Sequence, residues 1–199
     1  MGTRLVLATR NAHKVLELAE ILRDAGLDID LVPLPDDAPE VVEDGLTFTE
    51  NALKKARSAA AWTGFPAVAD DSGLCVDALN GMPGIFSARW AGSGRDDAAN
   101  LALVLDQVTD VPDDHLGAAF VCAAAVVGPD GVERVVEGRV VGQLIREPRG
   151  EGGFGYDPAF VPDGETRTTA EMPAAEKNAI SHRGNAFRAL APILRDMLG

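Results

Sequence analysis

The chain has 199 residues, of which 46% are hydrophobic, so it is long enough to bury a full core in one domain without metal or disulfide cross-links. Its 18 basic residues are outnumbered by 31 acidic ones, and the net charge of −13 argues against a nucleic acid polymer as partner, because polymer binding requires a basic surface. The sequence contains neither the ~20 consecutive apolar residues of a membrane helix nor a signal peptide, so we expect a cytoplasmic protein without membrane contact.

The apolar pattern predicts a mixed α/β fold, in which strands and helices alternate first and a hairpin follows. In chain order we expect a strand at 4–8, a helix at 14–25, a proline-broken connection at 32–39, a helix from 47 to about 62, a strand at 66–69, a helix at 96–108, strands at 117–127, 132–137 and 140–145, and a helix at 185–198. Gly26 and Gly64 are the expected stops of the first two helices. Thr47 and Glu50 have the spacing of a capping box. Pro192 lies inside the last helix and is expected to kink it or to face solvent.

Two adjacent carboxylates, Asp70 and Asp71, follow the apolar segment 66–69. Ligands of open α/β sheets bind at the carboxyl ends of strands, where Mg²⁺ takes one or two protein carboxylates together with water and phosphate. The segment therefore predicts a strand that ends at Ala69 and a metal site directly after it, and an ordinary Asp-Ser-Gly turn is the alternative. Adjacent strand residues point to opposite faces, which leaves the role of Asp70 open.

Two segments have the composition of a phosphate site. Residues 9–14 lie between a strand and a helix, where free backbone N–H groups and the helix dipole form an anion cradle, although the glycines of a P-loop are missing. Glu43 precedes a helix on which Asn51 and Lys55 are four residues apart and share a face that can look toward the carboxylates. A polar turn and a solvated helix surface are the respective alternatives.

Two further segments have the composition of a base-binding site. The glycine-rich run 150–158 carries Phe154 and Tyr156, and an aromatic ring on such a loop can stack on a nucleobase. The run 176–184 gathers Lys, Ser, His and Arg, which are donors suited to the keto oxygen of a base. A disordered loop and a structural histidine are the alternatives.

Six motifs occur together and in order. They are Thr-x-Asn-x-x-Lys at 9–14, Glu-x-Gly-x-Thr-Phe-x-Glu-Asn-Ala at 43–52, Ala-Asp-Asp-Ser-Gly-Leu at 69–74, Pro-Gly-x-x-Ser-Ala-Arg at 83–89, Gly-Gly-Phe-Gly-Tyr-Asp-Pro at 152–158 and Ser-His-Arg-Gly at 181–184. With them the whole chain, 1–199, closely resembles the inosine/xanthosine triphosphate pyrophosphatase family as a single domain of that kind.

The resemblance implies an elongated, two-lobed α/β fold with a long mixed central sheet flanked by helices and a cleft between the lobes, usually in a homodimer. It also implies Mg²⁺-dependent hydrolysis of dITP, ITP and XTP to the monophosphate and pyrophosphate, which cleanses the nucleotide pool. By position it makes Asp71 and Lys55 catalytic, and it makes Glu43 and Asp71 the metal ligands. The implied substrate-binding residues are Thr9, Arg10, Asn11, Ala12, His13, Lys14, Ser72, Phe154, Gly155, Tyr156, Asp157, Lys177, His182 and Arg183.

Residue chemistry and resemblance together predict that a water oriented or deprotonated by Asp71 attacks phosphorus in line, while Lys14 and Lys55 stabilise the departing pyrophosphate. Attack at the α-phosphorus is implied by the resemblance alone. Donors that meet the 6-keto oxygen of hypoxanthine or xanthine would reject adenine, whose 6-amino group leaves a buried donor unpaired. One rival is a pyrophosphatase for modified pyrimidine or methylated nucleotides, which the motifs at 152–158 and 181–184 disfavour. Another is a non-catalytic nucleotide sensor, which the metal-site acids disfavour.

Overall fold

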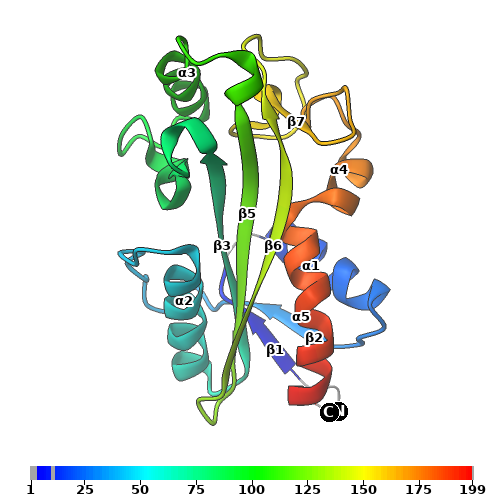
Figure 1. The fold of residues 1–199 in the computed structure, drawn as a ribbon. Coiled ribbons are helices and arrows are strands. Elements are labelled where there is room, and N and C mark those ends of the chain that lie inside the picture. Colours follow the sequence, from blue (N-terminus) through cyan, green and yellow to red (C-terminus); the bar gives the residue numbers. More distant parts are fainter. Residues whose placement is uncertain (1–3, 10–11, 199) are drawn as a thin grey trace. The chain divides into compact units, whose positions relative to one another are not determined.

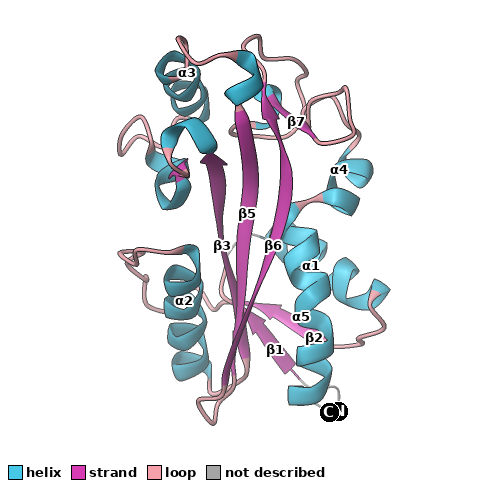
Figure 2. Ribbon diagram, viewed as in Figure 1, coloured by secondary structure: helices cyan, strands magenta, loops and turns pink. Residues whose placement is uncertain are grey.

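The computed structural model describes residues 4–9 and 12–198, which form a mixed α/β fold (Figure 1). The strands are β1 (Arg4–Leu7), β2 (Asp30–Pro33), β3 (Ala67–Val76), β4 (Met82–Pro83), β5 (Gly117–Val127), β6 (Glu133–Leu144) and β7 (Phe160–Pro162). The helices are α1 (Ala12–Asp24), α2 (Phe48–Thr63), α3 (Asp97–Gln107), α4 (Ala174–Ile180) and α5 (His182–Leu198), and Figure 2 shows them in cyan beside the magenta strands. Across the described ranges, no helix combines the length and the apolar character that a membrane crossing requires.

The strands of the described chain form one sheet in the order β2-β1-β3-β5-β6-β7, and β4 pairs with β3 beside this path. β1 runs parallel to both β2 and β3, whereas β4 is antiparallel to β3 and β7 is antiparallel to β6. The mixed central sheet predicted from the sequence is therefore confirmed.

The chain folds into two compact units. Unit 1 contains the described residues up to Asp71 together with 122–138 and 183–198, and unit 2 contains 72–121 and 139–182. Strands β3, β5 and β6 each contribute residues to both units. The assignment of 1–199 to a single domain stays a prediction.

Unit 1 has three layers, because helices cover both faces of its part of the sheet. Leu5 and Val68 pack with the apolar side chains of α1 and α5 on one face of the sheet. Val6 and Ala69 point to the other face, where they pack against α2. The α2 residues buried in that second cluster are all alanines, whose small side chains allow a helix to lie close to a sheet. Successive strand residues thus alternate between the two helix layers, as the two-residue period of a strand requires.

Unit 2 has its own hydrophobic core. Leu74 and Val76 of β3 pack there with Leu101 and Val104 of α3, and Phe160 at the start of β7 belongs to the same cluster. This core holds the glycine-rich run 150–158 at its edge, because that run contributes one buried aromatic side chain to it.

The predicted helix signals are confirmed. The Thr47 hydroxyl caps α2 by accepting the N–H of Glu50, and the Glu50 carboxylate in turn accepts the N–H of Leu46, 2.6 Å away. Helix α2 ends at Gly64, whose φ of 71° is left-handed. Pro192 lies within α5 and its side chain is exposed, which is the predicted way for a helix to accommodate it.

Three predicted boundaries were wrong. The connection expected at 32–39 begins with the end of β2, an edge strand that tolerates a proline at its last residue, Pro33. The two strands expected at 132–137 and 140–145 form the single strand β6, which lies between β5 and β7. The last helix begins at His182, three residues earlier than expected, and the short helix α4 precedes it.

Candidate active site

Strand β3 carries both aspartates in its middle. We expected the strand to end at Ala69, before the aspartates, but β3 continues through Asp70 and Asp71 to Val76, so this prediction was wrong. The continuing strand pairs antiparallel with β4 at Cys75 and Val76, and β5 is its neighbour in the sheet. The parallel pairing of β3 with β1, by contrast, is recorded at Ala67 and Val68 only. The two aspartates therefore lie just past the carboxyl end of β1, so the expected position of the acids at the carboxyl end of a parallel strand holds for β1.

The alternation of β3 separates the two aspartates. Asp70 follows the side of Val68, toward the α1 and α5 layer, and Asp71 follows the side of Ala69, toward α2. The two adjacent carboxylates thus face different helices, and each has its own set of partners.

The α2 face presents an amide and an ammonium group to Asp71. The Asn51 side chain donates from Nδ2 to Asp71 Oδ2 over 3.0 Å, and its Oδ1 accepts the N–H of Gly45 over 2.8 Å. Lys55 donates from Nζ to Asp71 Oδ1 over 3.3 Å. The capping box fixes where α2 begins, and the four-residue spacing then places Asn51 and Lys55 on one side. The predicted shared face toward the carboxylates is confirmed.

Glu43 brings a second carboxylate to the same ammonium group. Its Oε1 lies 3.5 Å from Lys55 Nζ, and its side chain is 39% exposed, whereas that of Asp71 is 13% exposed. Burial raises the pKa of Asp71 above its usual range; Lys55 and Asn51 oppose this, and the negative charge of Glu43 adds to it. Asp71 is therefore a shielded carboxylate whose charge depends on nearby cations.

This donor set fits a hard divalent cation. Two carboxylates converge on one positive charge, and Mg²⁺ characteristically takes one or two protein carboxylates and leaves its other positions to water and phosphate. Among the described residues, no group of three or more His, Cys, Asp and Glu side chains gathers in a way that could hold a metal.

Asp70 has a different partner. Its Oδ2 accepts the Nε–H of Arg183 over 3.1 Å, and the exposed fractions of the two side chains are 8% and 13%. Arg183 lies in the first turn of α5, so this ion pair ties the start of that helix to β3 within unit 1.

The predicted anion cradle at 9–14 is located only in part. Thr9 is half-buried and its carbonyl accepts the N–H of Leu34 over 3.0 Å. Arg10 and Asn11 lie outside the described residues. Ala12, His13 and Lys14 form the first turn of α1, and the description does not extend to their side chains.

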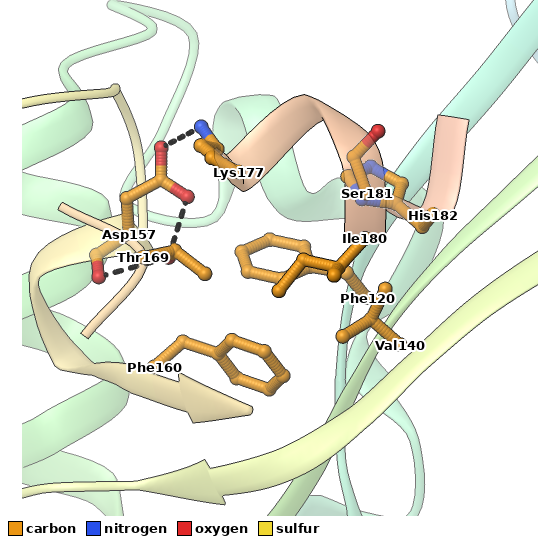
Figure 3. A pocket seen from close by; sticks show the side chains of 9 residues that line it. All are labelled: Phe120, Val140, Asp157, Phe160, Thr169, Lys177, Ile180, Ser181 and His182. Atoms are coloured by element: carbon orange, nitrogen blue, oxygen red, sulfur yellow. Dashed lines mark hydrogen bonds and ion pairs between the residues drawn. The ribbon is translucent and has the colours of Figure 1, made fainter. Parts of the chain in front are cut away.

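A second polar cluster lies in unit 2 and surrounds Asp157 (Figure 3). The Asp157 carboxylate accepts the Lys177 ammonium over 2.5 Å and the Thr169 hydroxyl over 2.8 Å. It also accepts the backbone N–H of Phe154 over 2.8 Å. Sequence reasoning missed Thr169, because a threonine beside another threonine belongs to no motif.

The two aromatic residues of the glycine-rich run have opposite environments. Phe154 is 67% exposed, whereas Tyr156 is 4% exposed and its hydroxyl donates to the carbonyl of Ser87 over 2.8 Å. Burial also raises the pKa of Tyr156 strongly. Gly155 donates its N–H to Asp97 over 2.9 Å. The run thus has a defined conformation, and only one of its two rings is available for stacking.

His182 borders an apolar pocket beside the Asp157 cluster (Figure 3). Its ring is stacked on Phe120, with centroids 5.1 Å apart and an interplanar angle of 16°. Phe120 in turn meets Phe160 edge to face at 4.8 Å. Residues lining this pocket are Phe120, Val140, Asp157, Phe160, Thr169, Lys177, Ile180, Ser181 and His182. Ser72, the remaining predicted site residue, is half-buried in β3 directly after Asp71.

Comparison with known proteins identifies relatives over the full length. A model of the Ham1 family matches residues 5–193. A protein of Streptomyces coelicolor named dITP/XTP pyrophosphatase is 64% identical over 201 residues, which cover 99% of this chain and 100% of that protein. The structure of a HAM1 protein from Coxiella burnetii superposes with a TM-score of 0.90 at 43% identity, covering 98% of this chain and 99% of the other. A Mycobacterium abscessus structure, titled nucleoside-triphosphatase / dITP/XTP pyrophosphatase, has a TM-score of 0.82 at 53% identity and covers 97% of this chain and 100% of its own.

Proposed function

The chain belongs to the Ham1 family, and we propose that it is a nucleoside triphosphate pyrophosphatase that hydrolyses dITP, ITP and XTP to the monophosphate and pyrophosphate. The observation that carries this proposal is the convergence of Glu43 and Asp71 on Lys55 in unit 1, with distances of 3.5 and 3.3 Å. A site with two carboxylates and one lysine suits a metal-assisted attack on a phosphoanhydride.

Glu43 and Asp71 would hold Mg²⁺, whose bound charge neutralises phosphate oxygens and lowers the pKa of a coordinated water. Asn51 supports this assignment, because its bond to Asp71 Oδ2 fixes the orientation of the carboxylate.

The side chains of this cluster have complementary roles in the reaction. Asp71 accepts a proton from the attacking water, whose oxygen forms a bond to the α-phosphorus. The bond from that phosphorus to the bridging oxygen breaks, and pyrophosphate leaves with the electron pair. Lys55 stabilises the charge that develops on the departing group, and Lys14 is proposed to assist it. Residues 9–14 and Ser72 are proposed to contact the phosphates.

Base recognition is assigned to the predicted residues of the glycine-rich run and of the run 176–184. Phe154 is exposed and would stack on the purine, while His182 and Arg183 supply donors for its 6-keto oxygen and Lys177 borders the base pocket. An adenine would place its amino group against these donors and leave one unpaired. Gly155 and Asp157 belong to the same loop, and Tyr156 supports it through its buried ring.

The family resemblance also supports a homodimer and a cytoplasmic location, where the free nucleotide pool is found. The dimer is tested by the mass in solution, measured by light scattering. A monomeric mass at working concentrations would remove the dimer from the proposal without affecting the hydrolysis.

The experiment that tests the function measures pyrophosphate release from ITP, XTP, dITP, GTP, ATP and a modified pyrimidine triphosphate, with Mg²⁺ and with EDTA. We expect release from ITP, dITP and XTP that exceeds release from GTP and ATP and that EDTA abolishes. Binding of ITP without turnover would indicate the nucleotide sensor. Preference for the pyrimidine would indicate the rival pyrophosphatase, and ATP turnover equal to that of ITP would refute the donor argument.

A further inference from the structure

Asp157 is surrounded by donors of its own chain. Its Oδ2 accepts Phe154 N–H and Lys177 Nζ, and its Oδ1 accepts the Thr169 hydroxyl. The exposed fraction of the Asp157 side chain is 5%. A carboxylate that is nearly closed to solvent and already has three donors offers little access to a donor from a nucleotide.

The same carboxylate determines the conformation of the loop that carries Phe154. Gly153 has a left-handed φ of 72°, and a Cβ at this position would overlap the Asp157 carboxylate. Glycine therefore lets the backbone fold over Asp157 closely enough for the next N–H to reach it. The exposed ring of Phe154 projects from a backbone that Asp157 fixes.

Lys177 connects the carboxylate to the ring. Its Nζ lies 5.0 Å from the centroid of the Phe154 ring, within the range of a cation–π interaction. The ion pair with Asp157 keeps the ammonium group at this place. One face of the Phe154 ring is thus taken by a cation, which leaves the opposite face for a base.

We propose that Asp157 is a positioning residue, which holds Lys177 against one face of Phe154 and so orients the ring for stacking, without contacting the nucleotide itself. This inference rests on the proposed function, because it takes a purine as the stacking partner. It differs from the direct substrate contact that the family resemblance implies for Asp157.

A double-mutant cycle separates positioning from direct contact. We compare the wild type with Asp157→Asn, Lys177→Met and the double variant, and we measure kcat and KM for ITP. If Asp157 acts through Lys177, each single change raises KM about tenfold, and the double change raises it no further, because coupled residues are not additive. Independent contacts would multiply to about a hundredfold, and that result would overturn the proposal.

Two adjacent buried threonines provide a second test that leaves the ion pair intact. Thr169 donates to Asp157, whereas the Thr168 hydroxyl donates to the carbonyl of Arg149 over 2.8 Å. We expect Thr169→Val to raise KM for ITP about threefold with kcat unchanged, since one of the hydrogen bonds to Asp157 is lost, and we expect Thr169→Ser to restore it. Thr168→Val is the matched control and should leave KM unchanged. Equal increases in the two valine variants would overturn the proposal, since they would reflect loop packing in general.

Wild-type turnover of ITP, measured in the same assay, keeps the two proposals apart. If the wild type is active and the increases in KM of the two single variants multiply in the double variant, the positioning role is contradicted and the proposed function is not. A wild type without turnover contradicts the proposed function, and the same cycle is then measured as binding of inosine monophosphate by calorimetry, where additivity again overturns the positioning role.

Discussion

Arg183 donates its Nε–H to Asp70, whereas the next residue, Asp71, accepts hydrogen bonds from Asn51 and Lys55. The two neighbouring aspartates thus belong to different faces of β3. We propose that their separation gives them different tasks, in which Asp71 meets the reacting groups and Asp70 anchors the first turn of α5. This division leads to opposite expectations for the same chemical change at the two positions.

Replacing Asp70 with asparagine should reduce stability. The change removes the carboxylate charge with which the Arg183 guanidinium pairs, at a side chain that is 13% exposed. Breaking a buried pair in this way costs up to about 3 kcal/mol. Urea unfolding monitored by circular dichroism gives the free energy of unfolding. Asp44→Asn, which breaks the exposed pair with Lys54, is the control and should leave the unfolding midpoint in place. Equal midpoints for Asp70→Asn and wild type would contradict the anchoring role.

Replacing Asp71 with asparagine should reduce kcat strongly without loss of stability. We expect kcat for ITP to fall at least ~10²-fold, since one preorganised charge is removed. Burial raises the pKa of Asp71, so its pKa is higher in the folded than in the unfolded state. The stability contribution of such a group is greatest at low pH and is lost as the pH rises through the folded pKa. At neutral pH a neutral asparagine should therefore unfold at the same temperature as wild type, or at a higher one. Turnover that survives the change nearly intact would exclude Asp71 from its assigned role.

The acid limb of the pH profile should depend on Lys55. Its positive charge opposes the effect of burial on the pKa of Asp71. Lys55→Met should therefore raise that pKa further and move the acid limb of kcat/KM to higher pH. Lys54→Met, at an exposed neighbouring lysine, should leave the limb in place.

Mg²⁺ should move the same limb in the opposite direction. A proton and a metal ion compete for the Asp71 carboxylate, so higher concentrations of Mg²⁺ are expected to shift the limb to lower pH. The measurement is kcat/KM against pH at two Mg²⁺ concentrations. If neither Mg²⁺ nor the Lys55→Met change shifts the acid limb of kcat/KM, the limb reports the titration of a group other than Asp71.

The sequence predicted local features of this site well. The spacing of Thr47 and Glu50 placed the start of α2, and from that start the four-residue interval placed Asn51 and Lys55 on one face. These features depend on backbone geometry within one helix, which neighbouring residues determine. The order of six motifs predicted the family, which the full-length relatives confirm.

Features that depend on distant partners could not be read from the sequence. Strand β3 pairs with the distant strand β5 and with β4, and the polar residues Asp70 to Ser72 gave no sign of a strand that continues. The partner of Asp70 is 113 residues away in the chain. Thr169 is selected by the position of Asp157, and nothing in its own neighbourhood distinguishes it from Thr168.

The different environments of Phe154 and Tyr156 yield the last prediction. Phe154→Leu removes an exposed ring, so it should raise KM for ITP by about tenfold or more, because base–aromatic stacking contributes ~1–3 kcal/mol, and it should leave thermal stability unchanged. Tyr156→Phe keeps the buried ring and removes its hydroxyl bond to Ser87, which should cost about 1 kcal/mol of stability with little effect on KM. Both variants are measured by ITP kinetics and thermal unfolding. The reverse pattern, in which Tyr156→Phe alters KM and Phe154→Leu alters only stability, would mean that the buried tyrosine and not the exposed phenylalanine meets the base.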